Sequence, residues 1–139
     1  MYYVDVFSRS LAVFGDFAPL FIRIGVAAVF VVHGYPKLFT QFSGTVQFFE
    51  SISLKPAKFW VVVVGVVEFF GGLAVALGFL TQLAALLIAV DMVGATVLVK
   101  FKQRFVGGWE FDFVLLTSAV ALMLIGAGPF SIDRFLGWG

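Results

Sequence analysis

Four long apolar runs, separated by short segments richer in polar residues, dominate the sequence of this 139-residue chain. A helix that crosses a lipid bilayer needs about 20 mostly apolar residues. The runs therefore predict four transmembrane helices, at about residues 17–39, 57–80, 82–100 and 109–127. Because short connections make consecutive helices antiparallel neighbours, the pattern predicts an all-α membrane protein. We expect an antiparallel bundle of four transmembrane helices that forms a single domain over residues 1–139.

Three shorter segments predict helices that lie at the membrane surface. Before the first span, apolar side chains recur at helical spacing at Val4, Phe7, Leu11 and Phe14. Between the first and second spans the same spacing indicates either an amphipathic or re-entrant helix or an ordinary loop, and its apolar positions are Phe42, Val46, Phe49 and Ile52. After the last span, a capped start to a short C-terminal helix is indicated by Ser131-Ile132-Asp133-Arg134.

Composition agrees with the membrane assignment. Hydrophobic residues make up 62% of the chain and charged residues 12%, whereas about 25% of the residues of a soluble domain are charged. The formal net charge of +1 is too small to indicate nucleic-acid binding, so we expect no nucleic-acid partner. The chain has no cysteine, which excludes disulfides, thiol redox chemistry and iron–sulfur or zinc sites with cysteine ligands.

Positive charge is distributed unevenly between the two ends of the predicted bundle. The connection between the first two spans and the one between the last two carry Lys37, Lys55, Lys58, Lys100, Lys102 and Arg104. The opposite end has only Arg9 and Arg134. Since cytoplasmic loops of membrane proteins are enriched in Lys and Arg, we expect a multi-pass protein with both termini outside the cytoplasm.

Ionisable residues inside the apolar runs are the best indication of a functional site. A charge at the centre of a membrane helix costs about 2.5–3.5 kcal/mol, so such side chains usually face the interior of the bundle. Their depth follows from the rise of about 1.5 Å per helical residue, which predicts two layers. The deep layer contains Arg23, Glu68 and Asp91, and a second layer near the cytoplasmic face contains His33, Lys37, Glu110 and Asp112.

The deep cluster has several interpretations. Arg23 and Glu68 could form an ion pair that only locks the first span to the second, or the cluster could bind a ligand, carry a proton or contact a partner subunit. If a quinone binds, we expect Glu68 near a quinone oxygen and Arg23 polarising the head group. Gly72, one of several small residues near Glu68, either allows close helix packing or leaves room for a flat ring. Asp91 and His33 would offer proton steps towards the two surfaces.

The single histidine is considered separately. His33 alone cannot define a zinc or haem site, so we expect no metal. A hydrogen bond from His33 to a carboxylate of the fourth span is the interpretation that we favour.

Four groups of motifs, taken in their order, resemble the DoxX family of small membrane proteins. The first span contains Arg23-Ile24-Gly25, His33-Gly34 and Lys37-Leu38-Phe39. The second span and the turn after it contain Glu68-Phe69-Phe70-Gly71-Gly72 and Leu77-Gly78-Phe79-Leu80-Thr81. The fourth span is preceded by Gly107-Gly108-Trp109-Glu110 and followed by Ser131-Ile132-Asp133-Arg134-Phe135. The resemblance covers about residues 18–136.

This resemblance implies a four-helix, multi-pass protein of a prokaryotic inner (plasma) membrane that is associated with redox systems. Relatives in the family include membrane subunits thought to pass electrons from sulfur compounds to quinone. Others anchor enzymes that handle thiols and oxidative stress.

The residues and the resemblance together predict a membrane subunit of a redox-associated complex. It would anchor or scaffold partner proteins and contribute to a quinone or lipid site. The alternatives are an oxidoreductase subunit that passes electrons from a sulfur compound to quinone, and a small transporter. Because the chain has no motif for flavin, haem or iron–sulfur, we expect an accessory or structural subunit rather than a self-sufficient enzyme, with quinone as its one candidate cofactor. Expected partners are membrane lipids, other membrane or redox subunits, or further copies of this chain.

Overall fold

The computed structural model describes residues 2–138, and this part of the chain consists of helices and the turns between them, without any strand. The α-helices are, in chain order, α1 (Tyr2–Ala12), α2 (Ala18–Tyr35), α3 (Phe42–Ser51), α4 (Ala57–Leu77), α5 (Thr81–Ala95), α6 (Glu110–Ile125) and α7 (Ile132–Phe135). A 3₁₀ turn precedes α2 at Gly15–Phe17. π-Helical turns extend α2 and α5 at Pro36–Thr40 and Thr96–Lys100. A kinked segment, Phe105–Trp109, leads into α6, and its residues Val106 and Gly107 have non-helical backbone angles.

Four helical segments are long and apolar enough to cross a membrane, namely Gly15–Thr40, Ala57–Leu77, Thr81–Lys100 and Phe105–Ile125. They confirm the predicted all-α fold with four membrane helices, and their ends differ from the predicted ones by a few residues. The short helices α1 and α7 were also predicted. The connection between the first two spans contains the helix α3, so the alternative of an ordinary loop is wrong.

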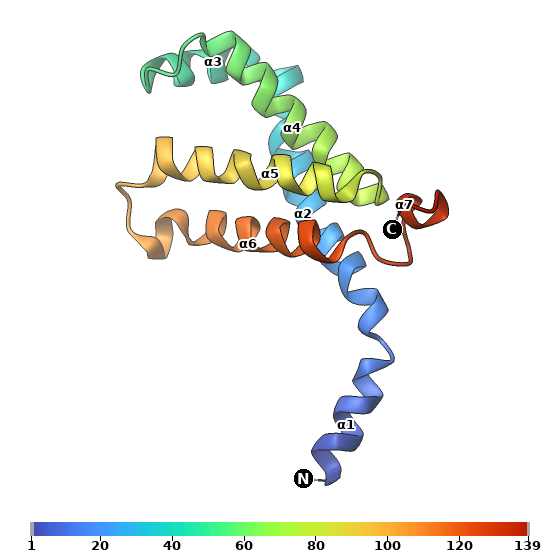
Figure 1. Cartoon of the computed structure of the whole chain (residues 1–139). Coiled ribbons are helices and arrows are strands. Elements are labelled where there is room, and N and C mark those ends of the chain that lie inside the picture. Colours follow the sequence, from blue (N-terminus) through green and yellow to red (C-terminus); the bar gives the residue numbers. More distant parts are fainter. Residues whose placement is uncertain (1, 139) are drawn as a thin grey trace.

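The four spans are arranged as two helical pairs that cross each other (Figure 1). α2 packs along α4, α5 packs along α6, and α4 also contacts α5. The core between the pairs contains Phe30, Ile88 and Leu122, which are almost inaccessible. Small residues such as Ala85 and Ala119 let the backbones approach in this region. Apolar side chains on the outer faces stay exposed, as expected for helices that face lipid.

Glycines bring α2 and α4 into close contact. A Cβ atom added to Gly34 would lie 2.4 Å from the backbone nitrogen of Phe69, and one added to Gly65 would lie 2.6 Å from the side chain of Leu38. At Gly34 the neighbouring atoms belong to the backbone of α4, so only glycine fits there, whereas at Gly65 the side chain of Leu38 would have to move. The close approach places the end of α2 directly against the part of α4 that carries Glu68, and this contact positions the candidate site.

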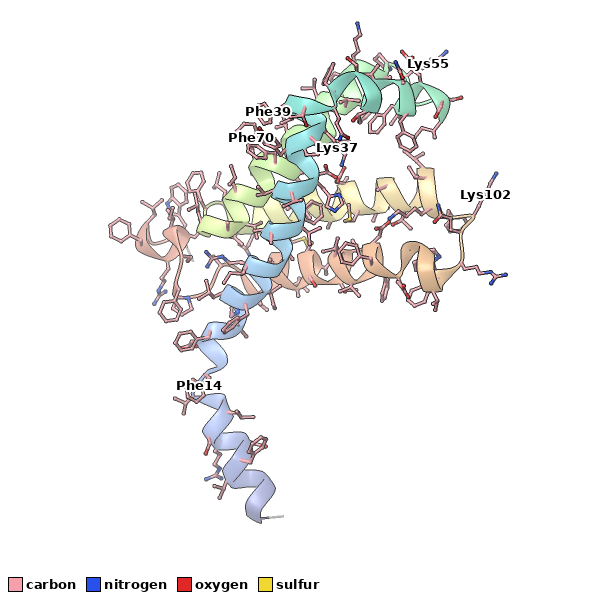
Figure 2. All side chains as sticks on the ribbon, turned by 180° about the vertical axis from the view of Figure 1, so that it is seen from behind. Phe14, Lys37, Phe39, Lys55, Phe70 and Lys102 are labelled. Carbon is pink, nitrogen blue, oxygen red and sulfur yellow. The ribbon has the colours of Figure 1, made fainter. Side chains whose placement is uncertain are left out.

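The two shorter helices α1 and α3 differ in their surroundings. α1 extends away from the bundle, and Phe14, just beyond its end, is exposed (Figures 1 and 2). α3 folds back over the start of α4, where Val46 and Phe49 pack against Ala57 and Val61. α3 therefore covers one end of the space between α4 and α5.

Candidate functional site

Lys37 and Glu68 form an ion pair between the first and second spans. Lys37 lies in the π-helical turn after α2, and its Nζ donates a hydrogen bond to Oε2 of Glu68 on α4. The side chain of Glu68 is only 6% exposed and that of Lys37 is 23% exposed. A buried carboxylate is tolerated when an opposite charge and hydrogen bonds compensate its lost hydration. The pair therefore places two charges inside the bundle.

A groove of about 520 Å³ lies beside this ion pair, between α4 and α5 and next to α3. Most of its wall is apolar and includes Phe48, Phe49, Trp60, Val64, Leu87, Val90 and Leu98. Its ionisable lining residues are Lys37, Glu68 and Asp91. Val90 and Leu98 are more than half exposed, so the groove can be reached from the side of the bundle that faces lipid.

Asp91 on α5 is the third ionisable residue of the groove, and together with Lys37 and Glu68 it forms the charged corner of the groove. One of its carboxylate oxygens, Oδ2, is buried without a hydrogen-bond partner. The carboxylate interacts electrostatically with both Glu68 and Lys37. Since buried polar atoms are almost always hydrogen-bonded, an unpaired Asp91 oxygen beside a groove is a candidate contact for a ligand.

A smaller cavity of about 200 Å³, the inner cavity, lies on the other side of the Lys37–Glu68 pair and is lined by all four spans. It contains a second ion pair, in which Nζ of Lys100 lies 2.8 Å from Oδ1 of Asp112. His33 lines it as well. Lys37 and Lys100 both lie in π-helical turns at the ends of spans, and such turns often occur at functional sites.

The groove suits an apolar ligand with a polar head group. The groove offers one ammonium donor and two carboxylates at a single corner, and these groups can bind oxygen atoms and exchange protons. A carboxylate can also act as a proton acceptor near a group that is being reduced or oxidised. No three His, Asp or Glu side chains of residues 2–138 are grouped so that they could share a metal ion.

Arg23 is not part of this site. Its guanidinium donates to four backbone carbonyls: Nε to Val75 at 2.8 Å, Nη2 to Ala76 at 2.8 Å, and Nη1 to Ala127 at 2.9 Å and Phe130 at 2.7 Å. Val75 and Ala76 belong to the last turn of α4, where helical carbonyls lack intrahelical partners. The prediction that Arg23 lies with Glu68 and Asp91 is therefore wrong, because Arg23 ties α2 to the last turn of α4 and to the segment that follows α6.

Asp133 is a second polar residue with a defined role at that end of the bundle. Its carboxylate accepts hydrogen bonds from the backbone nitrogens of Leu80 at 2.7 Å and Thr81 at 2.9 Å. It thereby caps the first turn of α5, and its own nitrogen donates to the carbonyl of Gly78 at 2.8 Å. The sequence placed Asp133 only at the start of a surface helix and gave no indication of this long-range cap.

Three further predicted site residues are placed differently from expectation. Gly72 faces α2, and an added Cβ would lie 3.0 Å from Val31, so the glycine serves helix packing and leaves no room for a flat ring. Glu110 accepts a hydrogen bond from the backbone nitrogen of Gly107 at 3.0 Å and does not line the inner cavity. His33 does line that cavity with Asp112, but the hydrogen-bonded partner of Asp112 is a lysine rather than the histidine.

Comparison with known proteins gives matches along most of the chain. The profile of the DoxX family matches residues 18–101. A Bacillus subtilis protein named "Putative oxidoreductase CatD" is 36% identical over 87% of this chain and 88% of its own length. An uncharacterized membrane protein of Mycobacterium tuberculosis is 33% identical over 92% of this chain and 86% of its own. The inner membrane protein YqjF of Escherichia coli is 32% identical over 87% and 93% of the two chains. No solved structure matches the chain.

These matches confirm the family resemblance and the expected location in part. The matched segment runs from the start of α2 past the end of α5, which includes the Lys37–Glu68 pair and Asp91. The four spans and the relatives named as inner membrane proteins agree with a multi-pass protein of the inner membrane. The chain belongs to the DoxX family of membrane proteins.

Proposed function

We propose that this protein is an inner-membrane subunit of a redox-associated complex and that its groove holds the head group of a quinone. The observation that carries the proposal is the apolar groove of about 520 Å³ with Lys37, Glu68 and Asp91 on its wall. Ligand sites typically have about 300–1,000 Å³ and an apolar lining with a few convergent polar groups. The name of the Bacillus subtilis relative, which includes the word oxidoreductase, agrees with a redox role.

The charged corner supplies the groups that quinone chemistry needs. Reduction of a quinone to a quinol takes up two electrons and two protons. The ammonium of Lys37 can donate a hydrogen bond to a quinone oxygen, and Glu68 and Asp91 can pass protons to the oxygens as electrons arrive. Lys37 takes the place that the sequence analysis gave to Arg23. The chain has no cysteine for an iron–sulfur cluster, so we assign the electron donor to a partner subunit.

The expected orientation follows from the positions of the basic residues. Figure 2 shows Lys55 and Lys102 at the same end of the molecule, the end where α3 and the connection between α5 and α6 lie. Because positive residues favour the cytoplasmic side, we place the charged corner nearer the cytoplasm and both termini outside it.

Quinone binding can be measured with the fluorescence of Trp60, which lines the groove. Replacing Trp109 and Trp138 by Phe leaves Trp60 as the single reporter. In nanodiscs, decyl-ubiquinone is expected to quench this fluorescence in a saturable manner. Glu68→Gln keeps the size of the side chain but removes its charge, and we expect it to weaken the binding.

A matched pair of glycine variants tests whether the groove itself is the site. Gly94 lines the groove, and a Cβ added there meets no atom within 4 Å, so Gly94→Leu fills the groove without disturbing the bundle. Gly25 on α2 is equally open but lies outside the groove. Gly94→Leu should abolish saturable quenching and Gly25→Leu should not. The proposal is contradicted if both variants show equal quenching, or if the protein with the unaltered groove shows no saturable quenching.

A surface of aromatic rings favours scaffolding as a second function. Tyr35, Phe39, Phe69 and Phe70 form a chain of ring contacts on α2, its π-helical turn and α4, with centroid distances of 5.0 Å, 5.3 Å and 5.1 Å between successive rings. Figure 2 shows Phe39 and Phe70 on the opposite side of the two helices from Lys37. We infer that this surface contacts a partner subunit within the membrane.

Purification of the complex from native membranes tests the scaffold role. Replacing Phe39 and Phe70 by Ala should remove copurifying redox proteins without changing the quenching of Trp60. Phe21→Ala, at an exposed position elsewhere on α2, is the control. Full retention of partners by the double variant would argue against this surface.

A further inference from the structure

The inner cavity and the groove meet at the Lys37–Glu68 pair. Both residues line both cavities, as do Ala95 and Val99 on the α5 side. These four residues therefore separate the two cavities. The ion pair is the charged part of this boundary, and its two side chains can contact groups in either cavity.

The inner cavity has the size and the chemistry to hold water. At about 30 Å³ per water molecule, its volume of about 200 Å³ has room for about six waters. Oδ2 of Asp112 is buried there without a hydrogen-bond partner. Buried polar groups are normally satisfied by protein or by ordered water. The ionisable groups that face the cavity are His33, Lys37, Glu68, Lys100 and Asp112.

The cavity also has a connection to the surface. Lys100 ends the third span, and its side chain is 34% exposed although its Nζ binds the buried Asp112. The residues that follow it, from 101 to 106, are exposed. On the other side, His33 and Lys37 line a third cavity of about 370 Å³ under α3, together with Gln41 and Thr45. Polar groups therefore continue from the surface to Glu68.

We propose that the inner cavity is filled with water and that protons travel through it from the surface at Lys100 to Glu68. The inference rests on the proposed quinone site, whose reduction consumes two protons for two electrons. A proton taken up at Asp112 passes along water to the Lys37–Glu68 pair and then to a quinone oxygen, with Asp91 on the groove side of the boundary. Hydrogen-bonded chains of carboxylates and water carry protons in this way in membrane proteins.

The absence of cysteine makes hydration directly measurable by single-cysteine labelling. Leu115 on α6 lines the inner cavity and Ala119, one turn further along the same helix, is fully buried and lines none of the three cavities. A membrane-impermeant charged methanethiosulfonate reagent should label Leu115→Cys from the side of Lys100 only. Ala119→Cys should stay unlabelled. An unreactive Leu115→Cys, or equal labelling of both variants, overturns the proposal that the inner cavity is hydrated, whether or not quinone binds.

The proton step is tested with Asp112→Asn, which keeps the shape of the side chain but cannot release a proton. Decyl-ubiquinone bound to the protein in nanodiscs is reduced by dithionite, which supplies the electrons, and the loss of quinone absorbance is followed. We expect slower reduction in Asp112→Asn with unchanged quenching of Trp60. Glu110→Gln, outside the cavity, should behave like the unaltered protein.

The outcomes separate the two proposals. If Asp112→Asn changes neither the quenching nor the reduction rate, the proton route is overturned but the proposed quinone site is not. Absence of quenching in the unaltered protein overturns the quinone site, and the route falls with it because the groove then has no proton acceptor.

Discussion

Replacing Arg23 should destabilise the bundle without affecting the proposed quinone site. Arg23 is 2% exposed and donates four hydrogen bonds to backbone carbonyls in the last turn of α4 and in the segment that follows α6. Arg23→Met keeps an unbranched apolar stem and removes all four hydrogen bonds. The carbonyls that remain cannot rotate towards water without unwinding the helix ends.

The magnitude follows from the number of bonds. Hydrogen bonds between membrane helices contribute about 0.6 kcal/mol each on average, which gives about 2.4 kcal/mol for the four. Hydrogen bonds with a charged donor contribute about 1.5 kcal/mol at the lower end of their range, which gives about 6 kcal/mol. We therefore expect Arg23→Met to lower the free energy of unfolding by about 2–6 kcal/mol. Arg23→Lys keeps the charge but has one nitrogen, so we expect roughly half of that loss.

The assay is unfolding of the purified protein in mixed micelles by titration with SDS, followed by far-ultraviolet circular dichroism. Arg104→Met, at an exposed position, is the control and should stay within about 0.5 kcal/mol of the unaltered protein. Folded Arg23→Lys should retain the quenching of Trp60 by decyl-ubiquinone. A destabilisation of Arg23→Met no larger than that of the control, or selective loss of quinone binding in Arg23→Lys, would refute the reasoning.

Three more variants test the packing and the charges. Asp133→Ala removes the cap of α5 and should cost about 1–2 kcal/mol in the same SDS titration. Gly34→Ala forces α2 and α4 apart and should cost about 1–3 kcal/mol, whereas Gly44→Ala, with open space around the added Cβ, should be nearly neutral. Lys37→Met leaves Glu68 buried without its ion-pair partner and should cost about 3–5 kcal/mol, and Glu68→Gln in the same chain should recover part of this loss.

For each of these variants, one result would contradict the physical reason given for the expected effect. Equal effects of Gly34→Ala and Gly44→Ala would show that the glycine contact between the helices does not limit their packing. If Glu68→Gln fails to rescue Lys37→Met, the cost does not come from an unpaired carboxylate. A neutral Asp133→Ala would mean that water satisfies the first turn of α5 as well as the carboxylate does.

The number, length and order of the membrane helices could be predicted from the sequence because each span is a continuous apolar run. The helical spacing of apolar side chains between the first two spans also indicated α3, and its apolar face packs on the start of α4. These features depend on local patterns, and local patterns are what a sequence shows directly.

The partners of the buried charges were harder to predict. Counting residues along a helix gives the depth of a side chain but not the neighbour it reaches. Arg23 and Lys37 both have long, flexible side chains that can extend along the helix. Arg23 extends to backbone carbonyls in the last turn of α4 and after α6, whereas Lys37 extends inward to Glu68, the deep carboxylate that had been assigned to Arg23.

Contacts between distant segments were missed for the same reason. The Lys100–Asp112 pair joins residues on either side of the connection between α5 and α6, and Asp133 returns from the C-terminal segment to cap α5. Lys100 had been counted only as an orientation signal. A search for carboxylates at the same predicted depth as each basic residue could have found the pair with Lys100, but no local pattern indicates the cap by Asp133.

The central claim, that the groove beside Lys37, Glu68 and Asp91 holds a quinone, is tested most directly by photolabelling. An azido-quinone would be irradiated with the protein in native membranes, and the labelled residues would be identified by mass spectrometry. We predict labels on α3, α4 and α5 at groove residues such as Phe48 or Val64, and competition by excess decyl-ubiquinone. Labels confined to the aromatic surface around Phe39, or labels that decyl-ubiquinone does not displace, would contradict the account.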